Sequence, residues 1–197
     1  GVATSELNEL AEKMIKELGG RPSFKNYKTS DDRIPYPASL CVSINNEIVH
    51  GIPNKKRILK EGDIVSLDAG MEYKGMYTDT AITVPVGKIS ARAAKIIDVC
   101  KKSLSRGIKT IKAGSYVGDI GYAVQNYAET EGFGVIRNLV GHGVGHSVHE
   151  EPEVPNFGKK KTLTKLKAGM VIAIEPMITE GGFEAVLSDD DWTWETG

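Results

Sequence analysis

Three of the four histidines lie in one glycine-rich stretch of the chain. Residues 138–152 read NLVGHGVGHSVHEEP and carry His142, His146 and His149. Because each glycine in a helix interior costs about 1 kcal/mol relative to alanine, we expect this stretch to form a strand or a tight loop. His142 lies between two glycines, which leave open space for an ion or a substrate to approach its imidazole. A lone histidine is more often a packed core residue, so the assignment of His142 as a ligand depends on its partners.

Two aspartates are predicted to lie on paired antiparallel strands that are joined by a turn at Lys74–Gly75. This register puts Asp68 opposite Ala81, so Asp79 becomes the diagonal neighbour of Asp68 on the same face. Two carboxylates on one face repel each other unless a cation lies between them. The pair therefore indicates a metal site, and the alternative is two solvated acids at strand ends.

Glu175 follows the apolar run Met170–Ile174 and is expected to be buried. An unpaired buried carboxylate is costly, so Glu175 requires a lysine, an arginine or a metal ion as its partner. With Asp68, Asp79 and His142 it forms a set of three carboxylates and one imidazole. This set suits a pair of Mn, Fe, Co or Zn ions better than a structural zinc, which would use thiolates. Two such ions would clamp a hydroxide and a carbonyl oxygen for hydrolysis.

The elements that must position these residues give an α+β fold class. Apolar residues at three- and four-residue steps predict helices at 4–18, 90–111 and 117–130, with Thr4 or Ser5 as the first N-cap. Runs of β-branched residues bounded by turn residues predict strands. The expected strands form two hairpins, at 40–49 and 64–84, and a second sheet region from 135–136, the histidine stretch, 170–174 and 183–187.

The order of these elements is repeated within the chain. Three pairs of segments match in the same order: 62–68 with 169–175, His50-x-x-Pro53 with His149-x-x-Pro152, and the helix between Gly1 and Gly19 with the helix between Gly114 and Gly132. The repeat predicts a single domain of two halves, about 1–89 and 90–197, facing each other across a central site. It also predicts a helix before Gly1 and further strands after Gly197, so both termini are expected to be trimmed.

The bulk composition restricts the class of protein. A net charge of -1 and a pI near 6.5 provide no global basic field for nucleic acid or an anionic membrane. Two cysteines are too few for a disulfide framework and indicate a reducing compartment, the cytoplasm. No apolar run approaches the roughly 20 residues that span a bilayer. The lysines at 159–161, 165 and 167 are expected to form a solvated loop, and contact with ribosomal RNA is the alternative.

Several motifs together resemble one known family. They are SLCVSINNEIVHGIP at 39–53, GDIVSLD at 62–68, Asp79-Thr80, GHGVG at 141–145, His149-Glu-Glu-Pro152 and Ile174-Glu-Pro-Met177. Over nearly the whole chain, the sequence resembles the type I methionine aminopeptidases of metallopeptidase family M24. The resemblance implies the pita-bread fold, in which two pseudo-symmetric halves of helices pack on a curved antiparallel sheet around a central metal site. It also implies a cytoplasmic, monomeric enzyme with two divalent metal ions that removes the initiator methionine from new chains.

The resemblance also implies roles for individual residues. It makes Asp68, Asp79, His142 and Glu175 four of five metal ligands, and the fifth, a bridging glutamate, would lie beyond Gly197. A metal-bridging hydroxide would be the nucleophile and Glu175 its proton acceptor. His146 is expected to be solvent-facing. The catalytic and substrate-binding residues implied in this way are His50 and His149, which would stabilise the tetrahedral intermediate, and Tyr36, Cys41, Val148 and Trp192, which would line the methionine pocket.

Alternatives to these roles stay open. Cys41 and Val148 could equally be ordinary core residues, and Arg33 stands where the family often has a second aromatic pocket residue. An X-Pro aminopeptidase or prolidase of the same fold would share the metal residues, but the segment at 43–53 disfavours it. An inactive peptide-binding module is the third possibility, because the fifth ligand is absent from this chain. The expected partners are the N-termini of nascent polypeptides and, transiently, the ribosome, with no DNA and no membrane.

Overall fold

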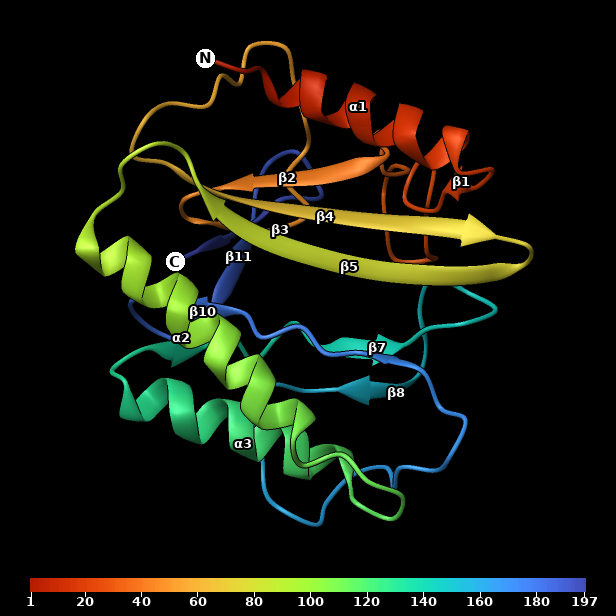
Figure 1. Ribbon diagram of the computed structural model, residues 1–197, viewed down its shortest axis with the longest axis vertical. Coiled ribbons are helices and arrows are strands. Elements are labelled where there is room, and N and C mark those ends of the chain that lie inside the picture. Colours follow the sequence, from red (N-terminus) through yellow and green to blue (C-terminus); the bar gives the residue numbers. More distant parts are fainter. The chain divides into compact units, whose positions relative to one another are not determined.

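The computed structural model describes all 197 residues, Gly1–Gly197, and shows an α+β chain with three helices and twelve strands (Figure 1). The chain forms two compact units. Unit 1 contains Gly1–Ser90, Gly145–Val148 and Val186–Glu195, and unit 2 contains Ala91–Val144, His149–Ala185 and Thr196–Gly197. Unit 1 therefore takes two short segments from the second half of the sequence. No helix combines the length and the apolar character that a membrane span requires.

Unit 1 is built on a long antiparallel hairpin. Its central strand β4 pairs with β5, and also with β2 and the short β1. The register places Asp68 opposite Ala81 and Asp79 opposite Gly70, which confirms the predicted diagonal arrangement of the two aspartates. The elements of this sheet and its covering helix are α1 (Thr4–Glu17), β1 (Arg21–Pro22), β2 (Leu40–Ile44), β4 (Ile64–Tyr73) and β5 (Met76–Pro85).

Helix α1 covers one face of this sheet (Figure 1). Its apolar side chains Leu7 and Ala11 pack on a buried cluster of Leu40, Val42, Leu59 and Val65. The predicted N-cap was wrong, because Ala3 precedes the first helical residue, Thr4. The Glu6 carboxylate accepts the Ala3 N–H at 2.8 Å, so a side chain from the first turn satisfies this donor instead of a Thr or Ser hydroxyl.

A second, smaller sheet contributes to unit 1. Strand β3 (Glu47–Val49) pairs with β12 (Trp194–Thr196), and β11 (Ala185–Leu187) adjoins β12. The expected hairpin of residues 40–49 is therefore only partly right, since β3 pairs with a strand near the end of the chain instead of with β2. The return of the chain beside β2 occurs later, where the Val42 N–H donates to the Gly51 carbonyl at 2.8 Å.

Unit 2 consists of two packed helices and two small antiparallel sheets. The helices lie side by side (Figure 1), with Gly107 of α2 in close contact with Ile120 and Val124 of α3. Strand β7 lies between β8 and β9, and β6 pairs with β10. The bounds are α2 (Ala91–Ile108), α3 (Val117–Thr130), β6 (Gly134–Val135), β7 (Gly141–Gly143), β8 (Glu150–Val154), β9 (Ile172–Ala173) and β10 (Ile178–Thr179). Strands β1, β10 and β12 were not predicted from the sequence, and β8 overlaps only the end of the histidine stretch.

Backbone hydrogen bonds inside the two units match at the offsets of the predicted sequence repeat. In unit 1, the Leu59 N–H donates to Val2 at 2.9 Å and the Thr4 N–H donates to Arg57 at 2.8 Å. Their counterparts in unit 2, at the offsets that relate the repeated motifs, are Leu166 to Ser115 at 2.8 Å and Val117 to Thr164 at 2.9 Å. Both repeated helices also end at a glycine with positive φ, Gly19 and Gly132. Each unit thus contains the same helix-to-strand frame.

One acidic side chain of α1 is predicted to affect stability at low pH. The Glu12 carboxylate accepts hydrogen bonds from Lys16 at 2.6 Å, Lys25 at 2.9 Å and Ser39 at 2.9 Å. These donors, with Lys16 the largest cause, lower the pKa of Glu12 from 4.5 to about 2. Because the folded-state pKa is depressed, the stabilisation is present above pH 4.5 and is lost as pH falls towards 2.

We expect Glu12→Gln to lower the free energy of unfolding at pH 7 by about 0.5–1 kcal/mol, a value reduced for solvent screening. The variant should also lose less stability than the parent protein when pH falls from 4.5 to 2. Urea unfolding over this pH range measures both effects. Glu17→Gln is the control, because Glu17 makes only an exposed contact of 3.8 Å with Lys13. Equal acid sensitivity in the parent and in Glu12→Gln would contradict the prediction.

Candidate active site

The structure places His142 in the buried central strand of a small sheet. It lies on β7 opposite Ala173 of β9 and is 8% exposed. The glycines on either side allow this packing. A Cβ at Gly141 would lie 2.3 Å from the Ala173 carbonyl oxygen, and a Cβ at Gly143 would lie 2.3 Å from the Glu151 carbonyl oxygen. The absence of a side chain at Gly141 and Gly143 therefore allows the neighbouring strands to approach β7 closely.

His142 Nε2 and Glu175 Oε1 face each other at 3.1 Å. His142 Nδ1 lies 2.7 Å from the Gly143 carbonyl oxygen, which can only accept, so Nδ1 carries the hydrogen. In a neutral imidazole Nε2 then has a lone pair. This Nε2 lies 3.1 Å from Glu175 Oε1, a buried atom that accepts no hydrogen bond. A proton or a metal cation between the two atoms would satisfy both.

The surroundings of this pair fit a metal ion. Imidazole ligands of metals commonly donate their second ring N–H to a carbonyl or a carboxylate, as His142 does to Gly143. The predicted burial of Glu175 is only partly right, since its side chain is 29% exposed although Oε1 is buried. No lysine or arginine forms an ion pair with Glu175. Its partner at this distance is the His142 imidazole.

The backbone beside Glu175 is held from two directions. The buried Asn156 amide donates to the Glu175 carbonyl at 2.6 Å, and the Cys100 thiol donates to the Pro176 carbonyl at 3.2 Å. Burial raises the pKa of the Cys100 thiol to about 11, so it remains protonated and a donor at neutral pH. Neither Asn156 nor Cys100 was singled out from the sequence. Their contacts fix the point at which the chain leaves β9.

Asp68 and Asp79 lie on the hairpin of unit 1. Their side chains occupy diagonal positions on one face of β4 and β5, and both are partly buried. Asp68 is also the neighbour of Cys41 across β2 and β4. Like charges on one face disfavour each other, which is the condition under which a bound cation would stabilise them.

His50 has a backbone conformation that is uncommon for a non-glycine residue. Its φ is 59°, in the left-handed region. The next residue is held firmly, because the Gly51 N–H donates to Ser43 Oγ at 3.1 Å and the Gly51 carbonyl accepts from the Tyr36 hydroxyl at 3.0 Å. Burial lowers the pKa of His50, although the negative charge of Asp79 opposes this shift. The imidazole is therefore neutral at neutral pH.

The other two histidines of the glycine-rich stretch differ in their surroundings. The His149 ring lies 4.3 Å from the His142 ring, centroid to centroid, with an interplanar angle of 71°. His149 is exposed. His146 is also exposed, which confirms that it is solvent-facing.

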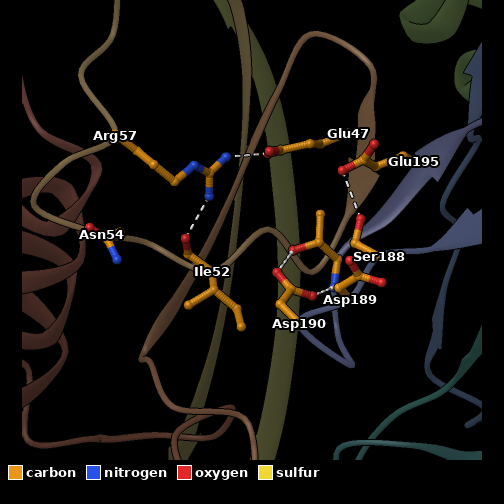
Figure 2. A pocket seen from close by; sticks show the side chains of 9 residues that line it. Glu47, Ile52, Asn54, Arg57, Ser188, Asp189, Asp190 and Glu195 are labelled. Atoms are coloured by element: carbon orange, nitrogen blue, oxygen red, sulfur yellow. Dashed lines mark hydrogen bonds and ion pairs between the residues drawn. The ribbon is translucent and has the colours of Figure 1, made fainter.

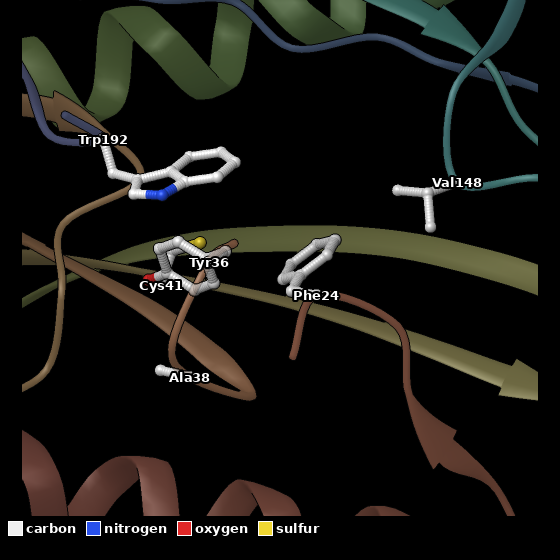
Figure 3. Close-up of a cluster of buried hydrophobic side chains, with 6 residues drawn as sticks. All are labelled: Phe24, Tyr36, Ala38, Cys41, Val148 and Trp192. Carbon is white, nitrogen blue, oxygen red and sulfur yellow. The ribbon is translucent and has the colours of Figure 1, made fainter. Parts of the chain in front are cut away.

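All four predicted pocket residues lie in one cluster of unit 1 (Figure 3). The Tyr36 and Trp192 rings meet edge to face, with centroids 5.2 Å apart. Figure 3 shows Cys41 beside Tyr36, and Val148 reaching the cluster from a separate segment of the chain. The cluster also contains Ala38 and an aromatic residue that the sequence reading missed, Phe24. Phe24 belongs to no motif recognised in the sequence. In the structure its ring lies in close contact with Gly70 of β4.

Comparisons with known proteins agree with these features. The family model described as metallopeptidase family M24 matches residues 1–193. The chain therefore belongs to metallopeptidase family M24. A methionine aminopeptidase of Clostridium acetobutylicum is 46% identical over 193 residues, which cover 98% of this chain and 75% of the relative. Methionine aminopeptidase 1 of Bacillus subtilis is 44% identical over the same shares of the two chains.

Solved structures give the same result for the fold. The methionine aminopeptidase of Thermotoga maritima matches with a TM-score of 0.95 at 41% identity, covering 100% of this chain and 76% of that one. The Xaa-Pro dipeptidase of Bacillus anthracis matches with a TM-score of 0.72 at 25% identity, covering 89% of this chain and 45% of that one. The predicted pita-bread fold is confirmed, and the X-Pro peptidases are the more distant relatives.

The glycine before His142 provides a test of the site geometry. Gly141→Ala would place a methyl group against the Ala173 carbonyl and push β9 away from β7. We expect a loss of about 1–3 kcal/mol in the free energy of unfolding and weaker binding of Mn²⁺. Urea unfolding and titration calorimetry measure the two effects. Gly181→Ala is the matched control, because a Cβ there meets nothing within 4 Å. Equal stability and metal affinity in both variants would contradict the described packing.

Proposed function

We propose that this chain is a metal-dependent aminopeptidase that removes methionine from the N-termini of polypeptides. The observation that carries the proposal is the facing pair of His142 Nε2 and Glu175 Oε1, 3.1 Å apart, in a member of family M24. Identity of 46% to a methionine aminopeptidase over 98% of this chain supports the choice of substrate. Hydrolysis of an N-terminal methionyl peptide bond is the reaction that unites these findings.

We assign Asp68, Asp79, His142 and Glu175 as ligands of two divalent ions, Co, Mn, Fe or Zn. Three carboxylates and one imidazole form an oxygen-rich donor set that these metals accept. When bound, the ions would act as Lewis acids on the scissile carbonyl and on the attacking water. The hydrogen bond from His142 Nδ1 to the Gly143 carbonyl fixes the ring so that Nε2 is the ligand atom.

Proton transfer is assigned to residues of the chain itself. Glu175 is proposed to accept the proton of the attacking water, since its Oε1 accepts no hydrogen bond from the protein. His50 is proposed to donate a hydrogen bond to the oxygen that becomes negative in the tetrahedral intermediate. A neutral imidazole can fill this role because it carries one N–H, and burial keeps the pKa of His50 low. His149, its counterpart in the repeat, is proposed to contact the substrate.

The methionine side chain is proposed to bind at the cluster of Tyr36, Cys41, Val148 and Trp192. Aromatic rings and a cysteine sulfur suit a polarisable thioether. Burial is the main cause that raises the pKa of Tyr36, so its hydroxyl stays protonated and continues to donate to the Gly51 carbonyl. The pocket wall is therefore tied to the residue that follows His50.

Two other functions are less well supported. The X-Pro peptidases share the fold, but the dipeptidase of Bacillus anthracis is 25% identical, against 46% for the Clostridium acetobutylicum relative. An inactive binding module would have no need of a buried carboxylate oxygen that faces an imidazole nitrogen. The proposed substrates are nascent polypeptides, which implies a cytoplasmic location and transient contact with the ribosome. Neither cysteine forms a disulfide, as a reducing compartment requires.

Removal of one proposed ligand tests the reaction. We expect Asp79→Ala to lower kcat for Met-Ala by more than about 100-fold in the presence of Mn²⁺, because a ligand carboxylate is lost. Circular dichroism should show an unchanged fold. Thr80→Ala, at the exposed neighbouring position of β5, is the control and should retain activity. Turnover of Ala-Pro in place of Met-Ala by the parent protein would favour the X-Pro alternative, and unchanged turnover by Asp79→Ala would exclude the proposed metal site.

A second substitution separates a pocket residue from an ordinary core residue. Val148→Ala should raise KM for Met-Ala by about 3- to 10-fold with little change in kcat, since one missing apolar contact weakens substrate binding by a factor of this order. Val154→Ala is the control, because Val154 is fully buried in the core of unit 2. It should lower the melting temperature without changing KM. If both variants lose stability and keep the parent KM, Val148 belongs to the core alone.

A further inference from the structure

The strained backbone at His50 lies within a loop that one arginine closes. A left-handed histidine persists only where its neighbours hold it in place. The Arg57 guanidinium donates from one nitrogen to the Ile52 carbonyl at 2.5 Å and forms an ion pair through the other with Glu47 (Figure 2). Glu47 precedes His50 by three residues and Ile52 follows it by two. Arg57 therefore joins the two sides of the His50 segment.

The Glu47 carboxylate also binds the main sheet of unit 1. The oxygen that pairs with Arg57 also accepts the N–H of Ile44 at 2.8 Å, at the end of β2. The Arg57 and Glu47 side chains are 25% and 18% exposed, so solvent screens their interaction less than that of a surface pair. The fork of Arg57 thus ties the His50 loop to a strand of the main sheet.

The segment that carries Trp192 lies on the other side of the same cavity. Figure 2 shows Arg57 and Glu47 on one side of a cavity of about 650 Å³ and Asp190 on the other. Asp190 accepts the N–H groups of Trp192 at 3.0 Å and Thr193 at 2.7 Å. Burial alone would raise the pKa of Asp190, but these hydrogen bonds and the charge of Arg57 lower it, so it is ionised at neutral pH.

The two segments meet at the His50 and Trp192 rings. Their centroids are 6.0 Å apart with an interplanar angle of 75°. Arg57 is bonded to the His50 loop through the Ile52 carbonyl, and its charge attracts the Asp190 carboxylate that holds the turn of Trp192. A change at Arg57 would therefore act first on the His50 loop, to which Arg57 is bonded directly.

We propose that Arg57 is a positioning residue, which holds the His50 imidazole against Trp192 in the orientation that catalysis requires. The proposal rests on the proposed function, in which His50 stabilises the intermediate. A guanidinium is needed because its planar fork binds the Ile52 carbonyl and the Glu47 carboxylate at once, whereas an ammonium is a single point charge. None of the four proposed metal ligands contacts Arg57 through a hydrogen bond or an ion pair.

The experiment compares Arg57→Lys, Arg57→Met and Glu47→Gln with the parent protein, using Met-Ala as substrate and Mn²⁺ as the metal. We expect kcat to fall by about 10- to 100-fold in both arginine variants, because small displacements of a catalytic group have effects of this size. KM and the affinity for Mn²⁺ should change by less than about 3-fold, which a general loss of structure would not allow. Glu47→Gln, which keeps an acceptor for Arg57, should show a smaller loss.

Arg21→Met is the matched control. Arg21 forms an Arg–Glu pair of 2.6 Å with Glu72 in the same unit but away from His50, and it should keep the parent kcat. Should Arg57→Met fail to fold, as a thermal melt would show, Arg57→Lys and Glu47→Gln decide the question. Full activity in Arg57→Lys would overturn the proposal, because it would show that charge alone suffices.

A double substitution separates this proposal from the proposed function. His50→Asn should lower kcat by itself, and adding Arg57→Lys should lower it no further if Arg57 acts through His50. Effects that simply multiply would overturn the positioning role. Parent-like kcat in His50→Asn would instead refute the role of His50 in the proposed function. A fall in kcat for His50→Asn together with parent-like kcat for Arg57→Lys would refute only the role of Arg57.

Discussion

The candidate site depends on the contact between His142 Nε2 and Glu175 Oε1, which lie 3.1 Å apart. The Gly143 carbonyl takes the hydrogen of His142 Nδ1, and Nε2 is left facing the buried Oε1 of Glu175. While the imidazole is neutral, both of these atoms are acceptors, and a buried acceptor without a donor is costly. The structure nevertheless holds them together through narrow strand spacing at Gly141 and the hydrogen bond from Asn156. This arrangement is stabilised when a cation lies between the two atoms, as expected for a member of a metallopeptidase family.

In unit 1 the proposed site residues are held in position by other kinds of contact. Its carboxylates lie on a long hairpin whose register the backbone hydrogen bonds determine, so Asp68 and Asp79 need little further support. His50 lies on a loop and has an uncommon φ, and it depends on contacts with Gly51 and Ile52 from several side chains. Strand residues are positioned by pairing and loop residues by specific hydrogen bonds. The two classes of site residue should therefore differ in their sensitivity to substitutions in their surroundings.

The sequence allowed the local features to be predicted better than the distant ones. The register of Asp68 against Ala81 could be predicted because a two-residue turn at Lys74–Gly75 fixes it. The N-cap of α1 was missed because Glu6, inside the helix, satisfies the Ala3 N–H. The pairing of β3 with β12 joins residues far apart in the chain, and no local pattern encodes such a contact. The roles of Phe24 and Arg57 could not be predicted for the same reason, because they depend on segments that are distant in the sequence and pack against these residues. The proposed pocket residues come from the family resemblance, and the structure groups them in one cluster.

The matching frames of the two units leave their side chains free to differ. The hydrogen bonds that define each frame, such as Leu59 to Val2 and Leu166 to Ser115, join backbone atoms and do not depend on side-chain identity. Side chains on such a frame can therefore differ between the two units without loss of the fold. Unit 1 carries a pair of aspartates and a buried apolar cluster, whereas unit 2 carries an imidazole and a longer acid. Different chemistry is thus carried by side chains on equivalent backbone frames.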